Sequence, residues 1–314
     1  MIKSTMVLGV AGVLALASTG AAAQFAPVSD RESFSGNPDR GAAIASGVEM
    51  FAWDTFQLGD DALAIVGTAP PSFVGVTGNV PEVGIGPEIE YGQDGILYVN
   101  DTNNNTLLHR LNPDTGAYLG VINLIFPPEG NVITAMEWIE GQLWGGLTTE
   151  SGGGAFNTFL CTISTTTGVI TVAGDTGINR PFGGLAWSGG TTLHAITAGG
   201  SSPELYTVTA LGVAVLVGPV TENGAAAPGM TALEFGPDGQ LYSLPNVQTP
   251  NAGDLYLINP RTANAVNLGA TGNTGLVALT SRLQCNSADL APPFGQLDFS
   301  DVIAFLGAFG AGCP

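Results

Sequence analysis

Residues 233 to 243 read LEFGPDGQLYS, and similar stretches occur three more times upstream. Each copy ends its first half on an aromatic residue, passes through a turn that contains glycine, and opens its second half with a leucine followed by an aromatic residue or histidine. The other copies are IEYGQDGILYV from Ile89, MEWIEGQLWGG from Met136 and LAWSGGTTLHA from Leu185. The leucines that open the second halves are Leu97, Leu143, Leu193 and Leu241, which lie 46, 50 and 48 residues apart. A fixed period of this length predicts one structural unit used repeatedly.

The repeat predicts strands throughout. Each period, from residue 83 to residue 272, contains several short apolar runs bounded by Gly, Pro, Asn or Asp, and none contains an amphipathic segment of helix length. A period of 40 to 50 residues built only of strands is typical of the blades of a β-propeller.

The two ends of this region predict how the ring closes. Three strand-like runs precede the repeats, at residues 48–53, 62–66 and 73–76, and a single apolar run follows them at residues 275–280. We expect the late strand to pair with the early ones, because this removes the exposed sheet edges and gives five blades. The repeated leucine and aromatic residues resemble the YVTN and NHL-type propeller repeats, which implies a fold and no particular activity.

Composition indicates export and excludes some function classes. Lys3, an apolar run at residues 6–17 and the small residues Ala21 to Ala23 predict a signal peptide over residues 1–23. Neither this run nor any later one is long enough to span a membrane. The net charge is −19 and Lys3 is the only lysine. Nucleic acid is therefore not an expected partner, and chemistry that needs a P-loop or Schiff-base lysine is excluded. We divide the rest into an N-terminal arm (24–46), a propeller (47–281) and a C-terminal module (282–314).

The C-terminal module carries the most specific motifs, ADLAPPFG, LDFSDV and AFGAGCP between residues 288 and 314. It resembles the GC-type dockerin domain, a short anchoring module in which a loop like half of an EF-hand holds calcium and a helix follows. The resemblance implies attachment to a surface or partner, and makes Asp289, Asp298 and Asp301 the candidate calcium ligands. Ala291 and Pro293 stand where the family has side-chain oxygens, so both a weak calcium site and a calcium-free loop are consistent with this sequence.

Two further expectations concern the same module. Val302, Ile303, Phe305, Leu306 and Phe309 follow the helical i, i+3, i+4, i+7 spacing. Of the three cysteines, Cys285 and Cys313 bracket the module, and we expect them to form a disulfide in an oxidising compartment, which leaves Cys161 free. A helix that simply folds back on the propeller is the alternative to an anchor.

Three acids recur at one position of the repeat, Glu90, Glu137 and Glu234, while the period that begins at Leu185 has Ala186 there. Strand alternation turns each Glu away from its apolar neighbours, so the three carboxylates are expected to converge near the central channel. They could serve as the acid and base of a glycosidase, form a ring that holds a cation, or accept hydrogen bonds from backbone groups between blades. The last interpretation fits a repeated residue best.

His109, His194 and Cys161 would attract a search for catalytic groups. His194 stands where other repeats have Tyr98, Trp144 and Tyr242, and His109 and Cys161 stand where others have Tyr206 and Tyr256. We therefore interpret all three as packing residues.

The sequence as a whole predicts an all-β, five-bladed propeller with a short helical, dockerin-like tail. We expect a secreted, extracellular or surface-attached protein that binds or scaffolds a carbohydrate or protein ligand, with no cofactor apart from calcium in the tail. The alternatives are a polysaccharide-active glycosidase or lyase that uses the channel carboxylates, and a purely structural surface-layer component.

Overall fold

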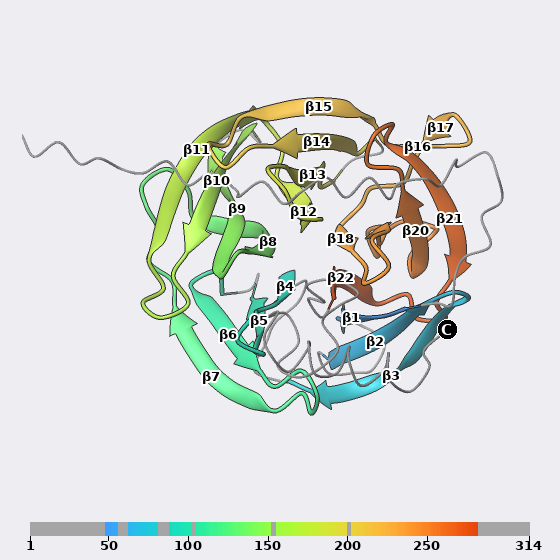
Figure 1. Cartoon of the computed structure of the whole chain (residues 1–314), viewed down its shortest axis with the longest axis horizontal. Coiled ribbons are helices and arrows are strands. Elements are labelled where there is room, and N and C mark those ends of the chain that lie inside the picture. The colour runs from blue at the N-terminus through green and yellow to red at the C-terminus, as the bar shows by residue number, and fades with distance from the viewer. Residues whose placement is uncertain are drawn as a thin grey trace, which may run out of the picture.

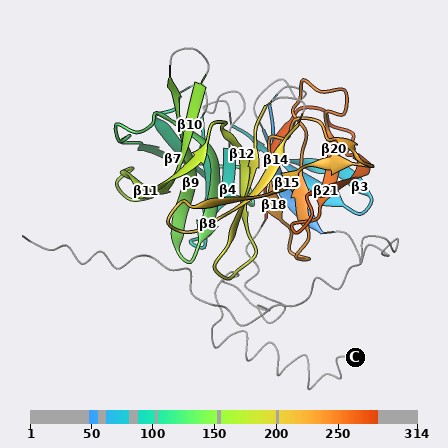
Figure 2. The same cartoon turned by 90° about the horizontal axis from the view of Figure 1, so that it is seen from above.

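A computed structural model describes residues 48–55, 62–80, 88–101, 104–151, 155–199 and 202–281. The predicted signal peptide and the whole N-terminal arm lie outside these residues, as does the tail with its expected helix. Every element in the described part is a β-strand, and the strands form five sheets around one axis. Figure 1 looks down this axis, and Figure 2 shows the ring from its edge. The prediction of an all-β, five-bladed propeller is confirmed.

Each blade begins with a strand beside the axis and continues outward through antiparallel neighbours. The first blade contains, from the axis outward, β22 (Leu276–Thr280), β1 (Glu49–Asp54), β2 (Ala62–Thr68) and β3 (Pro71–Asn79). The second contains β4 (Glu88–Tyr91), β5 (Leu97–Asn100), β6 (Leu107–Leu111) and β7 (Tyr118–Asn123). The third contains β8 (Val132–Ile139), β9 (Gln142–Ser151), β10 (Ala155–Ile163) and β11 (Ile170–Ile178).

The fourth blade contains β12 (Phe182–Trp187), β13 (Leu193–Thr197), β14 (Glu204–Val208) and β15 (Ala214–Pro219). The fifth contains β18 (Glu234–Phe235), β19 (Leu241–Ser243), β20 (Asp254–Ile258) and β21 (Asn264–Ala270), and is extended at its outer edge by β16 (Thr221–Glu222) and β17 (Ala225–Ala226). The last two strands form a small hairpin whose turn, Asn223-Gly224, has positive φ at both residues. An Asn-Gly turn of this kind suits a two-residue hairpin because its twist matches that of the strands.

The first blade joins the two ends of the described chain. β22 pairs antiparallel with β1, with Phe51 opposite Thr280 and Ala52 opposite Leu279. Asn273 Nδ2 adds a buried hydrogen bond of 2.5 Å to Asp54 Oδ2. The predicted closure of the ring by the late strand is confirmed.

Hydrophobic residues are buried between blades, with one core cluster at each of the five interfaces. In the cluster between the fourth and fifth blades, for example, Ile196 and Leu205 pack against Leu233 and Leu241. Because each sheet has apolar side chains on both faces, a single blade could not bury them alone. The ring therefore holds the inner strands, and whatever they carry, in fixed positions around the axis.

Candidate functional site at the hub

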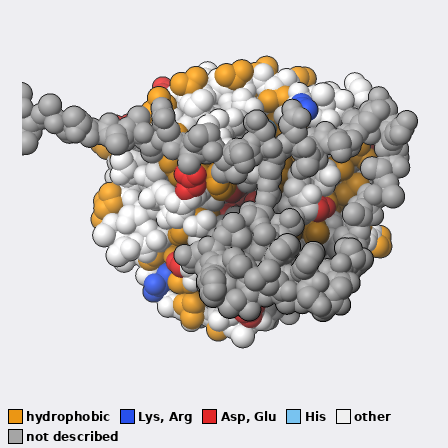
Figure 3. Space-filling view, in the orientation of Figure 1, with side chains coloured by type: hydrophobic (Ala, Val, Ile, Leu, Met, Phe, Trp, Pro, Cys, Tyr) orange, Lys and Arg blue, Asp and Glu red, His pale blue; other side chains and the backbone are white. Residues whose placement is uncertain are grey.

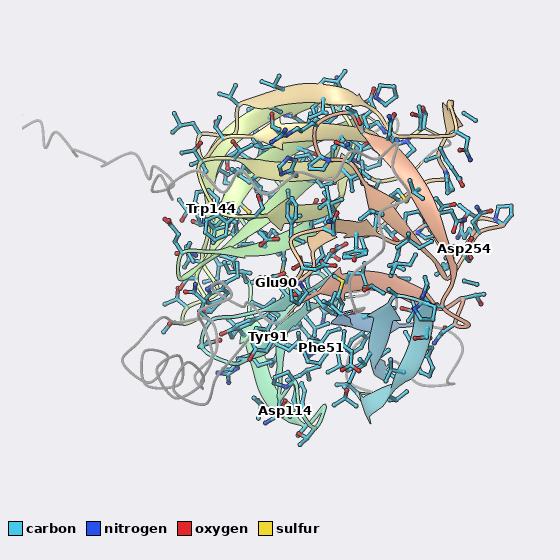
Figure 4. All side chains as sticks on the ribbon, turned by 45° about the vertical axis from the view of Figure 1, so that its right-hand side comes forward. Phe51, Glu90, Tyr91, Asp114, Trp144 and Asp254 are labelled. Atoms are coloured by element: carbon cyan, nitrogen blue, oxygen red, sulfur yellow. The ribbon has the colours of Figure 1, made fainter. Side chains whose placement is uncertain are left out.

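The repeated glutamates lie on the innermost strands. Each pairs across the blade with the aromatic residue of the second half of its repeat: Glu90 with Tyr98, Glu137 with Trp144 and Glu234 with Tyr242. This common register turns the carboxylates of β4, β8 and β18 toward the axis. One carboxylate oxygen from each lies within 4.8 Å of the others. Figure 4 shows Glu90 near the middle of the ring. We call these three residues the hub triad.

The hub triad is almost completely removed from solvent, with exposed fractions of 2% for Glu90, 2% for Glu137 and 5% for Glu234. Burial raises the pKa of all three carboxyls, and the neighbouring carboxylates raise those of Glu90 and Glu137 further. Hydrogen bonds from Ser281 work in the opposite direction at Glu234, whose pKa is nevertheless raised to about 8. Three carboxyls this close and this buried favour binding protons or a cation.

The carboxylates also connect neighbouring blades through hydrogen bonds. Trp138 N, in the third blade, donates to Glu90 Oε1 in the second at 3.0 Å. The backbone of Trp187, in the fourth blade, donates to Glu137 in the third. In both cases the donor is the residue that follows the hub position of the next blade. This position is Glu137 in the third blade and Ala186 in the fourth. Glu90 and Glu137 therefore accept hydrogen bonds from backbone groups of the next blade, which is the third of the interpretations given above.

The first blade uses hydroxyl groups at the corresponding place. Thr280, opposite Phe51, accepts a hydrogen bond from Tyr91 N at 3.1 Å and donates to Glu90 Oε2 at 3.3 Å. Ser281 Oγ donates to Glu234 Oε1 at 2.7 Å. Sequence reasoning predicted the strand that carries Thr280 but missed the role of both hydroxyls. The register of the inner strands could have identified Thr280, because Thr280 occupies the position in the first blade that Glu90 occupies in the second.

Aromatic contacts reinforce the same joints. Phe51 stacks on Tyr91 with ring centroids 6.2 Å apart, and Tyr98 stacks on Trp138 at 5.6 Å. The first of these pairs is labelled in Figure 4. Each pair joins the second strand of one blade to the innermost strand of the next. The hub thus combines a hydrogen bond and a ring contact at successive blade junctions.

One oxygen of the hub triad is not used by these joints. Glu137 Oε2 is buried and has no hydrogen-bond partner in the structure. A buried carboxylate oxygen without a donor is costly unless a proton or cation meets it. The triad can therefore share protons or ligate a metal ion. Acid–base catalysis would require a substrate to reach it, and none of the grooves described below is lined by the hub triad.

The two histidines and Cys161 occupy the packing positions that the repeat predicts. His194 pairs with Ala186, and its ring meets the edge of Phe235 at 5.5 Å, while burial lowers its pKa to about 4. His109 packs beside Tyr118, at a centroid distance of 5.8 Å. Cys161 is buried, its Sγ donates to Gly145 O at 3.3 Å, and burial raises the pKa of its thiol. None of them contributes a ligand atom to the hub triad.

The site residues predicted in the tail lie outside the described residues. These are Asp289, Asp298 and Asp301, the candidate calcium ligands, together with Cys285 and Cys313, the expected disulfide. They stay predictions. In the described part, no helix is long and apolar enough to cross a membrane.

Three shallow grooves lie between blades in the described part, and one crosses three blades. It has a volume of about 570 Å³ and is lined by Phe156, Arg180, Pro181, Ala198, Gly199, Ser202 and Asn246. Phe156 lies at the start of β10, and the other residues lie on connections that leave the same face of the ring, because the strands alternate in direction. The Arg180 guanidinium donates to the carbonyl oxygens of Ala198, Gly199 and Ser202 and so holds one wall in place. We call this the three-blade groove. The other two, of about 540 and 460 Å³, lie between the second and third blades and between the third and fourth.

Comparison with known proteins shows no family for this chain. No family model matches the chain, and no curated protein matches it in sequence. Among solved structures, the chain is similar to a chain of a nidogen/laminin complex, with 11% identity, a TM-score of 0.45 and coverage of 74% of this chain and 97% of that one. It is similar to TolB from Acinetobacter baumannii, with 14% identity, a TM-score of 0.45 and coverage of 74% and 54% respectively. It is also similar to a glutaminyl cyclase from Myxococcus xanthus, with 17% identity, a TM-score of 0.38 and coverage of 62% and 70%. The class defined by fold and site together is a five-bladed β-propeller with a buried acidic hub.

Proposed function

We propose that the protein is a non-catalytic binding or scaffold propeller whose ligand is a carbohydrate or a protein. The observation that carries this proposal is the use of the repeated carboxylates as acceptors between blades, in positions from which burial excludes solvent. Acids that join the blades are part of the framework of the ring, and binding is then a property of its surface.

The three-blade groove is the proposed ligand site. It offers an aromatic ring, Phe156, and polar groups around it, and no carboxylate lines it. Aromatic faces and neutral polar groups suit a sugar ring, which presents both apolar C–H surfaces and hydroxyls. The chain as a whole is acidic, and basic side chains are sparse on the face shown in Figure 3. The one charged group that lines the groove, Arg180, is already bonded to backbone carbonyls and paired with Glu204. A neutral oligosaccharide therefore fits this groove better than a strongly acidic ligand.

A glycan panel tests the proposal against the enzymatic alternative. The wild-type chain is incubated with neutral polysaccharides, and both retention and release of reducing or unsaturated ends are measured. We expect retention without turnover, weakened by Phe156→Ala and unaffected by Leu216→Ala, which truncates an exposed residue on β15. Turnover that is lost in Glu137→Gln and Glu234→Gln would contradict the proposal and establish a glycosidase or lyase.

Export and attachment are part of the same proposal and rest on the sequence. The signal peptide would direct the chain out of the cell, and the dockerin-like tail would attach it to a surface component or partner protein. Truncation after Arg282 is expected to release the protein into the medium while the propeller still melts cooperatively. If the truncated chain fractionates with the surface as before, the tail is not an anchor.

A further inference from the structure

We propose that the hub triad binds one calcium ion, which holds the inner strands of three blades together. This site is separate from the predicted calcium loop of the tail and does not depend on the ligand of the three-blade groove. It is formed by Glu90 of β4, Glu137 of β8 and Glu234 of β18.

The charge at the hub is the first argument. Three carboxyls lie together with exposed fractions of at most 5%, and the only ion pair in the described part joins Arg180 and Glu204 elsewhere, at 4.0 Å. The hydrogen bonds at the triad come from neutral backbone and hydroxyl donors, which cannot neutralise three charges. Buried acids without a basic partner must take up protons or a cation.

The free oxygen is the second, independent argument. Glu137 is 2% exposed, and although the Trp187 backbone donates a hydrogen bond to this carboxylate, its Oε2 has no hydrogen-bond donor. A framework role alone would leave this atom unsatisfied. A cation between the carboxylates would satisfy this oxygen. The three residues can share one ion, because one carboxylate oxygen of each lies within 4.8 Å of the others.

The chemistry of the ligands favours calcium. All the side chains that meet at the hub present oxygen, either as carboxylate or as hydroxyl, and hard oxygen donors suit Ca²⁺ and Mg²⁺ rather than softer metals. Calcium bonds oxygen at 2.3–2.6 Å, so ligands on opposite sides of the ion lie about 4.6 to 5.2 Å apart. Magnesium needs a tighter octahedron, with opposite ligands about 4.0 to 4.2 Å apart. A spread of at most 4.8 Å admits either ion. Calcium is favoured because it accepts irregular coordination by carboxylates, whereas magnesium demands a near-ideal octahedron and keeps several of its waters.

The experiment compares melting midpoints of the full chain with and without calcium. Protein stripped with a chelator and dialysed at pH 7.5 is melted alone, with 1 mM CaCl₂ and with 1 mM MgCl₂. A ligand that binds only the folded protein raises the midpoint, and we expect an increase of about 5 to 10 °C with calcium and less than half of this with magnesium. Atomic emission on protein purified without chelator is expected to find about one calcium ion per chain, in addition to any that the tail binds.

Two variants assign the effect to its site. Glu137→Gln keeps the shape of the side chain and removes one negative charge, so without calcium it is expected to melt at or above the wild type, and calcium is expected to raise its midpoint far less. The double variant Asp298→Asn with Asp301→Asn removes candidate ligands from the tail, and is expected to keep the full calcium effect. Glu222→Gln, at a half-buried acid of the outer hairpin, is the matched control for loss of one charge.

The outcomes separate the two proposals. A wild-type chain whose midpoint calcium does not change, or a calcium effect that Glu137→Gln retains, would overturn the hub site. A calcium effect that disappears in the tail variant would also overturn it, because the ion would then belong to the tail. None of these results alters the expected retention of a glycan by the wild type or its weakening in Phe156→Ala, which lies outside the hub.

Discussion

At the scale of single residues, the acid of the repeat links one blade to the next. Glu90 accepts the backbone N–H of Trp138, which belongs to the following blade, and the Trp138 ring stacks on Tyr98, the cross-strand neighbour of Glu90. One position of the repeat thus satisfies a buried backbone donor and sets the distance between two sheets. Buried backbone donors without partners are rare in folded proteins because they are expensive.

Removing the acceptor oxygen of Glu90 should therefore cost more stability than removing only the negative charge of its carboxylate. Glu90→Ala leaves Trp138 N without a partner, whereas Glu90→Gln keeps an acceptor oxygen in the same place. We expect Glu90→Ala to be less stable than Glu90→Gln by about 1 to 3 kcal/mol, measured by urea unfolding in chelator. Equal stabilities of the two variants would show that the bond to Trp138 contributes nothing.

The hub also predicts a pH dependence. The pKa of Glu234 is about 8 in the folded protein, and its reference value is 4.5. Between these two pH values, the folded state keeps a proton that the unfolded state has lost. Stability then falls as pH rises through this window. In chelator, the free energy of unfolding should drop by about 1 to 2 kcal/mol between pH 6.5 and 8, and the drop should be smaller in Glu234→Gln. Stability that stays level or rises over this range in the wild type would contradict the assignment.

His194 predicts the opposite trend at lower pH. Its pKa of about 4 in the folded protein lies below the reference value of 6.5, so the unfolded state binds the proton more strongly and stability is lost as pH falls through this window. Glu234 changes stability in the opposite sense over the same range, so the contribution of His194 is the difference between the wild type and a His194 variant. Between pH 7.5 and pH 5, the wild type should lose about 2 kcal/mol relative to that variant. His194→Phe keeps a ring against Phe235 and should remove this loss, as urea unfolding of both proteins at the two pH values would show. The same acid loss in the variant would mean that other groups cause it.

At the scale of elements, glycines on the outer strands allow neighbouring blades to touch through their backbones. Gly78 of β3 meets the turn at Gly116, and Gly174 of β11 meets Leu211 in the turn between β14 and β15. A side chain at either position would collide with backbone of the next blade. The outer rim is therefore closed by backbone contact, while the hub is closed by carboxylates and rings.

Gly174→Ala tests this contact. Its Cβ would collide with the carbonyl of Leu211, so the two blades must separate, and we expect a loss of about 2 kcal/mol or more in the free energy of unfolding. Gly75→Ala on β3 is the matched control, because a Cβ there meets nothing within 4 Å. Comparable stabilities of the two variants would contradict a close contact at the rim.

The elements also show where prediction from sequence succeeds. The leucine and aromatic residues of each repeat predicted the inner strands and their register, because burial on both faces of a blade leaves a strong pattern. The strands β16 and β17 were missed although Asn223-Gly224 is a strong hairpin signal, since their short runs, Thr221–Glu222 and Ala225–Ala226, carry little hydrophobic pattern. The hub hydroxyls were missed for another reason: the first blade is assembled from both ends of the described chain, so its repeat is not continuous in sequence.

At the scale of the whole molecule, closure of the ring creates the hub. The carboxylates come from three blades, and the sequence predicted that they converge, because one register places one side chain on each inner strand. Their distances, their burial and the free oxygen of Glu137 could not be predicted, since they depend on how five sheets tilt around the axis. The fold alone identifies no ligand, which is why the proposed function rests on the state of these acids.

The central claim is that the repeated acids serve the framework of the ring and not catalysis. The most direct measurement is a crystal structure of the full chain grown with calcium, with anomalous scattering recorded at long wavelength. We predict one anomalous peak on the axis, bonded to Glu90, Glu137 and Glu234, in a ring closed by β22 on β1. A hub that shows no peak and is open to solvent, with a bound sugar against the same carboxylates, would contradict it.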